Sequence, residues 1–135
     1  NRIWAHNDFV TRKIQFQTEE IIEKIIGKKI KKGFTSFLQY DDCAELTKHL
    51  DRDQATYTLS IQLQYLNETT PVENQWPIFI DDKNGQTISY QAKNGQAVLF
   101  KGNELIHYRE KLKKGHNCRV ICLHFTTSDY QGKFL

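Results

Sequence analysis

The sequence predicts a mainly β fold of the sandwich or barrel type, with at least one helix packed outside it. Residues 57–65 alternate strictly between apolar and polar side chains, which is the pattern of a half-buried antiparallel strand. Further along the chain, short apolar segments are separated by turn signals, with no helical pattern between them. Many short strands joined by turns are typical of β-sandwiches and barrels.

The first element that we expect is an amphipathic helix that begins at Thr18. Glu19 and Glu20 follow this residue, and acidic side chains are favourable in the first turn of a helix. Isoleucines then recur at helical spacing, at positions 21, 22, 25 and 26. The helix should therefore pack one face against another element.

The rest of the chain is predicted to be mostly strand. Residues 34–40 alternate with a period of two, and in residues 57–65 we expect the apolar side to face the core. The polar loop that follows is longer than a hairpin needs, so we expect residues 68–76 to border a binding site. Further strands are predicted at residues 78–80, 87–91, 97–100 and 118–125, with Asn-Gly turns at 84–85 and 94–95.

Length and composition limit the class of protein. With 135 residues we expect one domain covering 1–135, and because the sequence begins with Asn and not Met we expect upstream elements to be missing from it. No apolar run approaches the ~20 residues of a membrane span. The three cysteines are odd in number and form no CxxC pair, which favours a reducing, cytoplasmic environment over a disulfide framework.

The charge does not indicate a nucleic-acid partner. A formal charge of +3 is small for a protein that binds a polyanion. One basic run stands out, with lysines at positions 24, 28, 29, 31 and 32. We interpret these lysines as cations that complement the carbonyl end of the predicted helix, the alternative being a phosphate-binding patch.

The stretch KHLDRD contains two metal-capable side chains, His49 and Asp51, just before the strand at 57–65. A third, His107, lies in the sequence LIHYRE. Two imidazoles and one carboxylate on a β scaffold can form a facial triad that holds Fe(II) and leaves other coordination positions open. We expect chemistry, if any, at those open positions.

From about residue 34 to residue 125 the sequence resembles the 2-oxoglutarate- and Fe(II)-dependent oxygenases, especially their prolyl-hydroxylase-like branch. The resemblance rests on the His-x-Asp order, the strand end QYLN, the LF before a turn, the distal histidine and an arginine that opens the next strand. It implies a double-stranded β-helix, or jelly roll, with a supporting N-terminal helix. It also implies that His49, Asp51 and His107 bind the iron.

The same resemblance implies residues for the cosubstrate. Arg119 would pair with the distal carboxylate of 2-oxoglutarate, with Tyr65 and Tyr40 as supporting hydrogen-bond donors. The planar guanidinium fork suits a buried carboxylate, and Tyr65 falls in the alternation on the side assigned to the core. Arg109 also lies near the expected metal and could compete for that carboxylate.

Each assignment has an ordinary structural alternative. His49 and Asp51 could form a surface turn, His107 could be a strand-edge histidine, and the tyrosines could be core aromatics. Arg119 could be a solvated strand residue. The other histidines, at positions 6, 116 and 124, lack matching partners and are interpreted as structural or surface residues.

The function that we expect is Fe(II)- and 2-oxoglutarate-dependent hydroxylation of an unidentified small-molecule or peptide substrate, such as a prolyl residue or an amino acid. The alternative is a non-catalytic, cupin-like jelly-roll binding module. Formation of succinate would separate the two. Nothing in the sequence indicates a membrane partner or an oligomeric state.

Overall fold

The computed structural model describes residues 2–67, 70–71 and 76–133. It is a mainly antiparallel β structure with one helix, as the sequence predicts. In chain order the elements are β1 (Arg2–His6), α1 (Phe9–Ile26), β2 (Ile30–Tyr40), β3 (Leu46–His49), β4 (Tyr57–Asn67), β5 (Thr70–Pro71), β6 (Ile78–Asp81), β7 (Thr87–Tyr90), β8 (Ala97–Phe100), β9 (His107–Arg109) and β10 (His116–Thr127).

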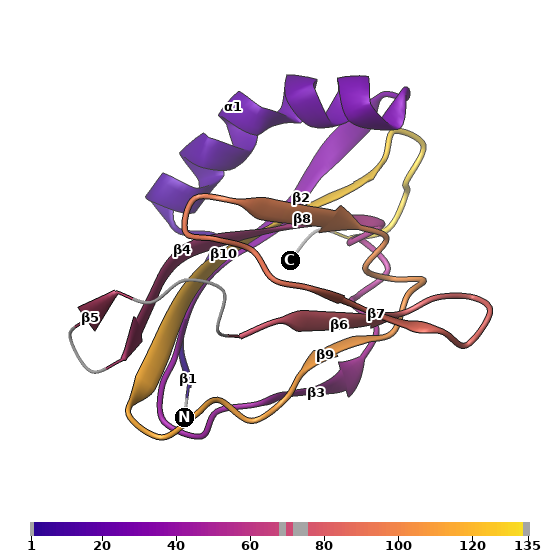
Figure 1. Ribbon diagram of the computed structural model, residues 1–135. Helices are drawn as coiled ribbons and strands as arrows, with labels where there is room; N and C mark the ends of the chain where they lie inside the picture. Colours follow the sequence, from indigo (N-terminus) through magenta and orange to yellow (C-terminus); the bar gives the residue numbers. More distant parts are fainter. Residues whose placement is uncertain (1, 68–69, 72–75, 134–135) are drawn as a thin grey trace.

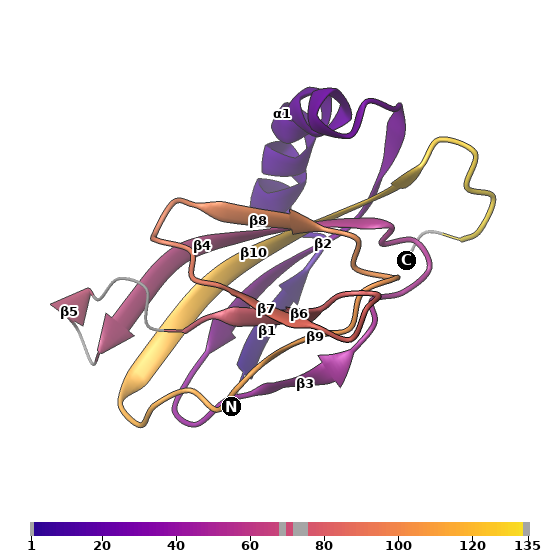
Figure 2. The ribbon, with the colours of Figure 1, turned by 45° about the vertical axis from the view of Figure 1, so that its right-hand side comes forward.

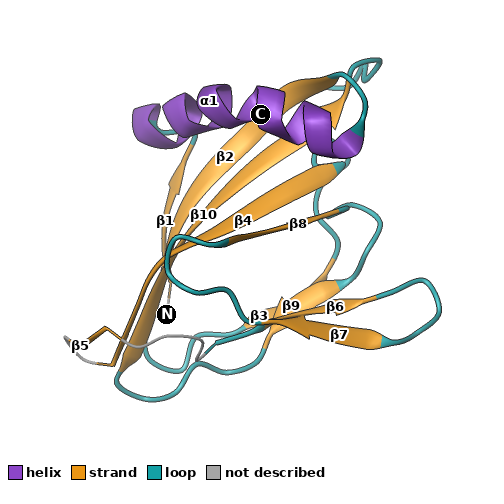
Figure 3. Cartoon of the chain, turned by 45° about the horizontal axis from the view of Figure 1, so that its top comes forward, coloured by secondary structure: helices purple, strands orange, loops and turns teal. Residues whose placement is uncertain are grey.

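The elements form three layers (Figure 1). The larger sheet has the strand order β1-β2-β10-β4-β5, with β8 also paired to β4, and the smaller sheet has the order β3-β9-β6-β7. All strand pairs among the described residues are antiparallel. Helix α1 lies on one face of the larger sheet and the smaller sheet on the other, as Figures 2 and 3 show. The larger sheet is therefore covered on both faces.

Helix α1 begins at Phe9, nine residues before Thr18, so the predicted start of the helix was wrong. Asp8 is the N-cap, and its carboxylate accepts hydrogen bonds from the amides of Val10 and Thr11, each at 3.0 Å. The first two turns bury polar side chains, Thr11 and Gln15, where an amphipathic helix usually buries apolar ones. The apolar periodicity therefore begins well after the first residue of the helix, which explains the late prediction.

The predicted strands are present, with some changes at their ends. The prediction at residues 97–100 matches β8 in full, whereas β10 extends beyond the predicted 118–125. Gly85 and Gly95 have positive φ, as the Asn-Gly turns require. The sequence pattern did not indicate β1, β3 or β9, because these strands are short or exposed on both sides.

The basic run at and beyond the end of α1 is paired with acidic side chains of the same helix. Three of its lysines form ion pairs with helix glutamates: Lys24 with Glu20 at 3.6 Å, Lys29 with Glu23 at 3.5 Å and Lys32 with Glu19 at 2.9 Å. These pairs favour the structural interpretation of the run over a phosphate site. No helix within the described residues is long and apolar enough to cross a membrane.

Most of the loop at residues 68–76 lies outside the described residues, so its expected role at the mouth of a site stays a prediction. Trp76 at its end is 4% exposed, and its indole nitrogen donates to the carbonyl of Glu110 at 2.8 Å. Trp76 is therefore a packing anchor where the chain enters the smaller sheet.

Candidate active site

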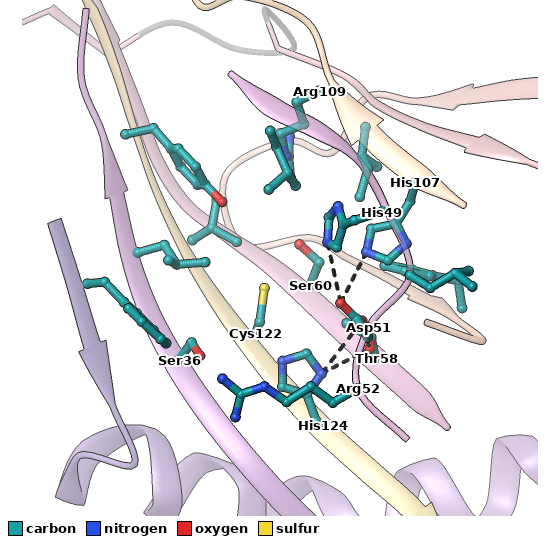
Figure 4. Close-up of a pocket in the computed structure, with 18 of the residues that line it drawn as sticks. Ser36, His49, Asp51, Arg52, Thr58, Ser60, His107, Arg109, Cys122 and His124 are labelled. Carbon is teal, nitrogen blue, oxygen red and sulfur yellow. Dashed lines mark hydrogen bonds and ion pairs between the residues drawn. The ribbon is translucent and has the colours of Figure 1, made fainter. Parts of the chain in front are cut away.

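Two histidines face each other across a strand pair of the smaller sheet. His49, the last residue of β3, is paired in register with His107, the first residue of β9. Asp51 follows β3 by two residues, and its amide donates to the carbonyl of Gly102 at 2.9 Å. The structure thereby brings together the three residues that the sequence predicts as metal ligands (Figure 4).

The potential ligand atoms of this triad converge on one point. Oδ1 of Asp51 lies 3.5 Å from Nε2 of His49 and 3.4 Å from Nε2 of His107. Two ligands bound at a right angle to one ion, each at about 2.1 Å, would lie about 3 Å apart. All three ligand atoms lie within 4.8 Å of one another, so the triad must contract to bind one ion with all three.

The backbone fixes the orientation of both imidazoles. Nδ1 of His49 lies 2.7 Å from the carbonyl of Thr47, and Nδ1 of His107 lies 2.9 Å from the carbonyl of Leu105. Because a carbonyl can only accept, each Nδ1 carries the proton in these contacts, which leaves Nε2 free to bind a metal.

The carboxylate of Asp51 is ionised in this setting. Burial acts to raise its pKa, but the contacts with His107 and His49 outweigh it and hold the pKa well below the usual range. In return, the contact with Asp51 raises the pKa of His49. The ionised carboxylate beside the two imidazoles would attract a divalent cation.

A second layer of side chains supports Asp51. The hydroxyl of Thr58 donates to Oδ2 of Asp51 at 2.7 Å and lies 3.0 Å from Nδ1 of His124. Since the hydroxyl proton goes to the carboxylate, His124 acts as the donor in the second contact. Burial lowers the pKa of His124 to about 4, so its imidazole is neutral at neutral pH. The sequence analysis missed both residues.

The triad opens into a cavity of about 270 Å³ between the two sheets. Tyr40 and Arg109 line it, together with Cys122 and Ser60 from the larger sheet. Burial raises the pKa of the Tyr40 phenol to about 12, so it is a neutral donor. Of the three residues expected to hold the cosubstrate, Tyr40 alone lines this cavity.

Arg119 does not face the cavity, which corrects the prediction that it pairs with the carboxylate of 2-oxoglutarate there. It shares one face of β10 with Ile121 and Leu123, as the alternation predicts, but that face packs toward α1. Its guanidinium donates to the side-chain oxygens of Gln39 at 3.1 Å and Gln64 at 3.0 Å. The cavity is lined by the alternate residues of β10, which point to the smaller sheet.

Arg109 is the buried arginine at the cavity. It is 7% exposed, and Nη1 donates to the carbonyl of Trp76 at 2.8 Å. Its guanidinium carbon lies 4.8 Å from the centre of the Trp76 ring. No acidic side chain forms an ion pair with it among the described residues. A buried guanidinium without a carboxylate is costly unless a ligand supplies the negative charge.

Tyr65 also differs from the prediction. A β-bulge interrupts the pairing of β4 with β10, where Arg119 is opposite Gln64 and Val120 is opposite Gln62. The extra residue, Leu63, reverses the alternation, so Tyr65 is not on the side of Leu59 and Ile61. Tyr65 is fully buried, and its hydroxyl lies 2.9 Å from Nδ1 of His116 outside the cavity lining.

The polar side of β4 was also assigned to the wrong environment. Thr58, Ser60 and Gln62 were expected to face away from the core, but each is at most 5% exposed. Before the bulge, Tyr57, Leu59 and Ile61 pack in the cluster under α1, whereas Thr58 and Ser60 face the smaller sheet and line the cavity. A sheet that is covered on both faces has no solvent side for its polar residues.

Comparisons with known proteins identify the fold. No protein-family model matches the chain, and no curated protein matches it in sequence. Solved structures do match, among them the α-ketoglutarate-dependent epimerase SnoN of nogalamycin biosynthesis, with a TM-score of 0.71 and 6% identity over 93% of this chain and 60% of that one. A Pseudomonas putida prolyl-4-hydroxylase has a TM-score of 0.69 and 15% identity over 94% of this chain and 72% of that one. The chain has the double-stranded β-helix fold of the 2-oxoglutarate/Fe(II) oxygenases.

A third similar structure was solved with the cosubstrate bound. EctD from S. alaskensis, described with 2-oxoglutarate and 5-hydroxyectoine, has a TM-score of 0.66 and 11% identity over 93% of this chain and 56% of that one. The chain therefore spans between about half and three quarters of the length of these three proteins. The jelly-roll prediction is confirmed.

Proposed function

We propose that the protein is an Fe(II)- and 2-oxoglutarate-dependent oxygenase. The observation that carries this proposal is the convergence of His49, Asp51 and His107 beside a cavity of the matching fold. Two neutral imidazole nitrogens and one carboxylate oxygen suit Fe(II) and leave coordination positions open. The donor set of this chain therefore fits the metal that similar structures use.

When bound, iron and 2-oxoglutarate supply the activation of O₂ and the oxidation of a C–H bond, and the protein supplies position and a dry site. His49, Asp51 and His107 would hold the iron. Thr58 keeps the Asp51 carboxylate in place, and the carbonyls behind the histidines keep their rings in place. The reaction that we propose is hydroxylation.

Arg109 is the residue that we propose for the distal carboxylate of 2-oxoglutarate, in place of Arg119. It is the buried cation of the cavity, and Trp76 orients its guanidinium from one side. The neutral phenol of Tyr40 lies at the same end, close enough for the charge of Arg109 to affect its pKa. Tyr40 would give the carboxylate a further donor.

The experiment that tests the function combines metal binding with turnover. Binding of Mn(II) is measured by calorimetry, and succinate formation is measured with Fe(II), 2-oxoglutarate and O₂. Asp51→Ala should abolish succinate formation and weaken Mn(II) binding about 10-fold or more, because a ligand is lost. The matched control is Asp53→Ala, which removes an exposed carboxylate two residues away.

Equal Mn(II) affinity in the Asp51→Ala and Asp53→Ala variants would contradict the metal site. Tight metal binding without any succinate from the wild-type protein would favour the alternative, a cupin-like binding module. Both outcomes are measured on the same preparations.

A further inference from the structure

The side chains that line the cavity carry more positive charge than a bound Fe(II) ion and 2-oxoglutarate would neutralise. Its lining residues include three arginines, Arg2, Arg52 and Arg109, but one carboxylate, that of Asp51. Fe(II) and the dianion of 2-oxoglutarate cancel each other in charge. Three guanidinium groups against one carboxylate leave two positive charges along the loaded cavity, and Arg2 and Arg52 carry theirs at its solvent-exposed edge.

The arginines occupy two ends of the cavity. Arg2 and Arg109 share the end at Tyr40, where the guanidinium carbon of Arg2 lies 5.9 Å from the ring centre. Arg52 lies at the other end, beside His124 and Ser36, with the metal triad between it and Arg109 (Figure 4). One dianion at the Tyr40 end therefore leaves Arg52 without an anionic partner.

Arg52 is held in place without being neutralised. Its guanidinium carbon lies 5.2 Å from the centre of the Phe34 ring, and that ring stacks on His124 with ring centres 3.9 Å apart. In the described part of the chain no carboxylate forms an ion pair with Arg52. A cation over an aromatic face keeps its N–H groups available for a ligand.

The cavity lining also includes apolar side chains that are partly open to solvent. Trp4 and Leu50 line the same cavity, and their exposed fractions are 51% and 50%. Exposed apolar side chains at a cavity mouth are typical of surfaces that a ligand covers. A ligand there would combine an apolar part with an anionic group.

We propose that the substrate of this oxygenase is an organic anion, in which a carboxylate or phosphate binds Arg52 and an apolar portion contacts Trp4 and Leu50. This inference rests on the proposed function, because it assigns the cosubstrate to the Tyr40 end. Arg52 directly follows the ligand Asp51 in the chain, so an anion bound to it is held beside the metal.

The test measures binding, which does not require turnover. Calorimetry is carried out on the protein loaded with Mn(II) and 2-oxoglutarate, without O₂. The probes are phenylacetate, hexanoate and phenyl phosphate, with phenylacetamide and hexanamide as neutral counterparts. The variants are Arg52→Gln, which removes the charge, Arg52→Lys, which keeps the charge but loses the fork, and Lys13→Ala as a control for lost charge on the outer face of α1.

We expect at least one acid to bind about 10-fold or more tightly than its amide, and Arg52→Gln to remove that preference, as expected for a charged hydrogen bond. Arg52→Lys should retain part of the preference for the acid, and Lys13→Ala should retain all of it. The affinity for 2-oxoglutarate should stay within a factor of about two in all variants. A preference for phenyl phosphate over both carboxylates would assign the anion as phosphate, and the reverse as carboxylate.

Three results would overturn the inference: no binding of any acid at millimolar concentration, equal binding of acids and amides, or a loss of 2-oxoglutarate affinity in Arg52→Gln. The last would assign Arg52 to the cosubstrate. Failure of wild-type protein to bind 2-oxoglutarate would instead contradict the proposed function, and the acid and amide pairs measured without 2-oxoglutarate would still test Arg52.

Discussion

The carboxylate of Asp51 packs directly against Gly102, where a side chain could fit only if its neighbours moved. A Cβ atom added to Gly102 would overlap both Oδ2 of Asp51 and the hydroxyl of Thr58. The same glycine accepts the hydrogen bond from the Asp51 amide. Gly102 therefore sets the position of the carboxylate through close approach and not through an unusual φ.

Gly102→Ala should lower the affinity for Mn(II) by about 10- to 100-fold, because the carboxylate and its supporting hydroxyl must move. Calorimetry measures the affinity, and thermal unfolding measures stability separately. Gly85→Ala is the control, since it strains an exposed turn with φ of +80° away from the site. If both variants bound Mn(II) as the wild type does, Gly102 would have no role in the site.

Substitution with lysine shows whether Arg109 or Arg119 binds the carboxylate of 2-oxoglutarate. Arg109→Lys keeps the charge but loses the planar fork, so the dissociation constant for 2-oxoglutarate should rise about 10-fold or more, with Mn(II) affinity little changed. Arg119→Lys should leave both constants unchanged, because its guanidinium binds two glutamines on the other face. Titration of 2-oxoglutarate into both variants decides the matter, and a larger effect at Arg119 would restore the original prediction.

At the scale of elements, α1 is joined to the larger sheet through buried polar groups as well as isoleucines. The side-chain amide of Gln15 is fully buried and donates to the carbonyl of Gly33 at 3.1 Å and to that of His124 at 2.8 Å. The hydroxyl of Thr11 meets that of Thr35 at 2.7 Å. The helix therefore fixes the backbone beside His124, at the back of the metal site.

Gln15→Leu should destabilise the protein by about 1–3 kcal/mol, because two carbonyls lose a donor in a buried setting. Urea unfolding followed by circular dichroism measures the change in the free energy of unfolding. Gln17→Leu is the matched control, since Gln17 is exposed on the same helix. A loss of similar size in both variants would show that the buried contacts contribute nothing specific.

For the molecule as a whole, the site joins the two sheets. The histidines come from the smaller sheet, whereas Thr58 and His124, which support Asp51, come from the larger one. A metal that binds the folded state alone stabilises it by about 2.7 kcal/mol at a concentration 100 times its dissociation constant. Metal binding should therefore raise the free energy of unfolding of the whole protein.

Addition of Mn(II) should raise the melting temperature by several degrees, and a chelator should reverse the change. Differential scanning calorimetry measures it. Asp51→Ala should show a clearly smaller shift at the same Mn(II) concentration, because its affinity is lower, whereas Asp53→Ala should behave as the wild type. A shift of equal size in Asp51→Ala would place the metal elsewhere in the protein.

The sequence by itself determined the strand pattern and the types and order of the triad residues. Alternation with a period of two identifies β4 and β10 because it is a local property of the backbone, and a His-x-Asp pair with a distal histidine is specific when it occurs among such strands. The sequence alternation also placed Arg119 with Ile121 and Leu123 correctly on one face.

The tertiary structure alone decided which face holds the cavity. The larger sheet is buried on both sides, by α1 and by the smaller sheet, so polarity does not distinguish its two faces. The bulge at Leu63 then reverses the alternation before Tyr65, which no period-two pattern can indicate. Arg109 enters the cavity from a three-residue strand whose position depends on pairing with residues far apart in the chain, and such pairing is a property of the whole fold.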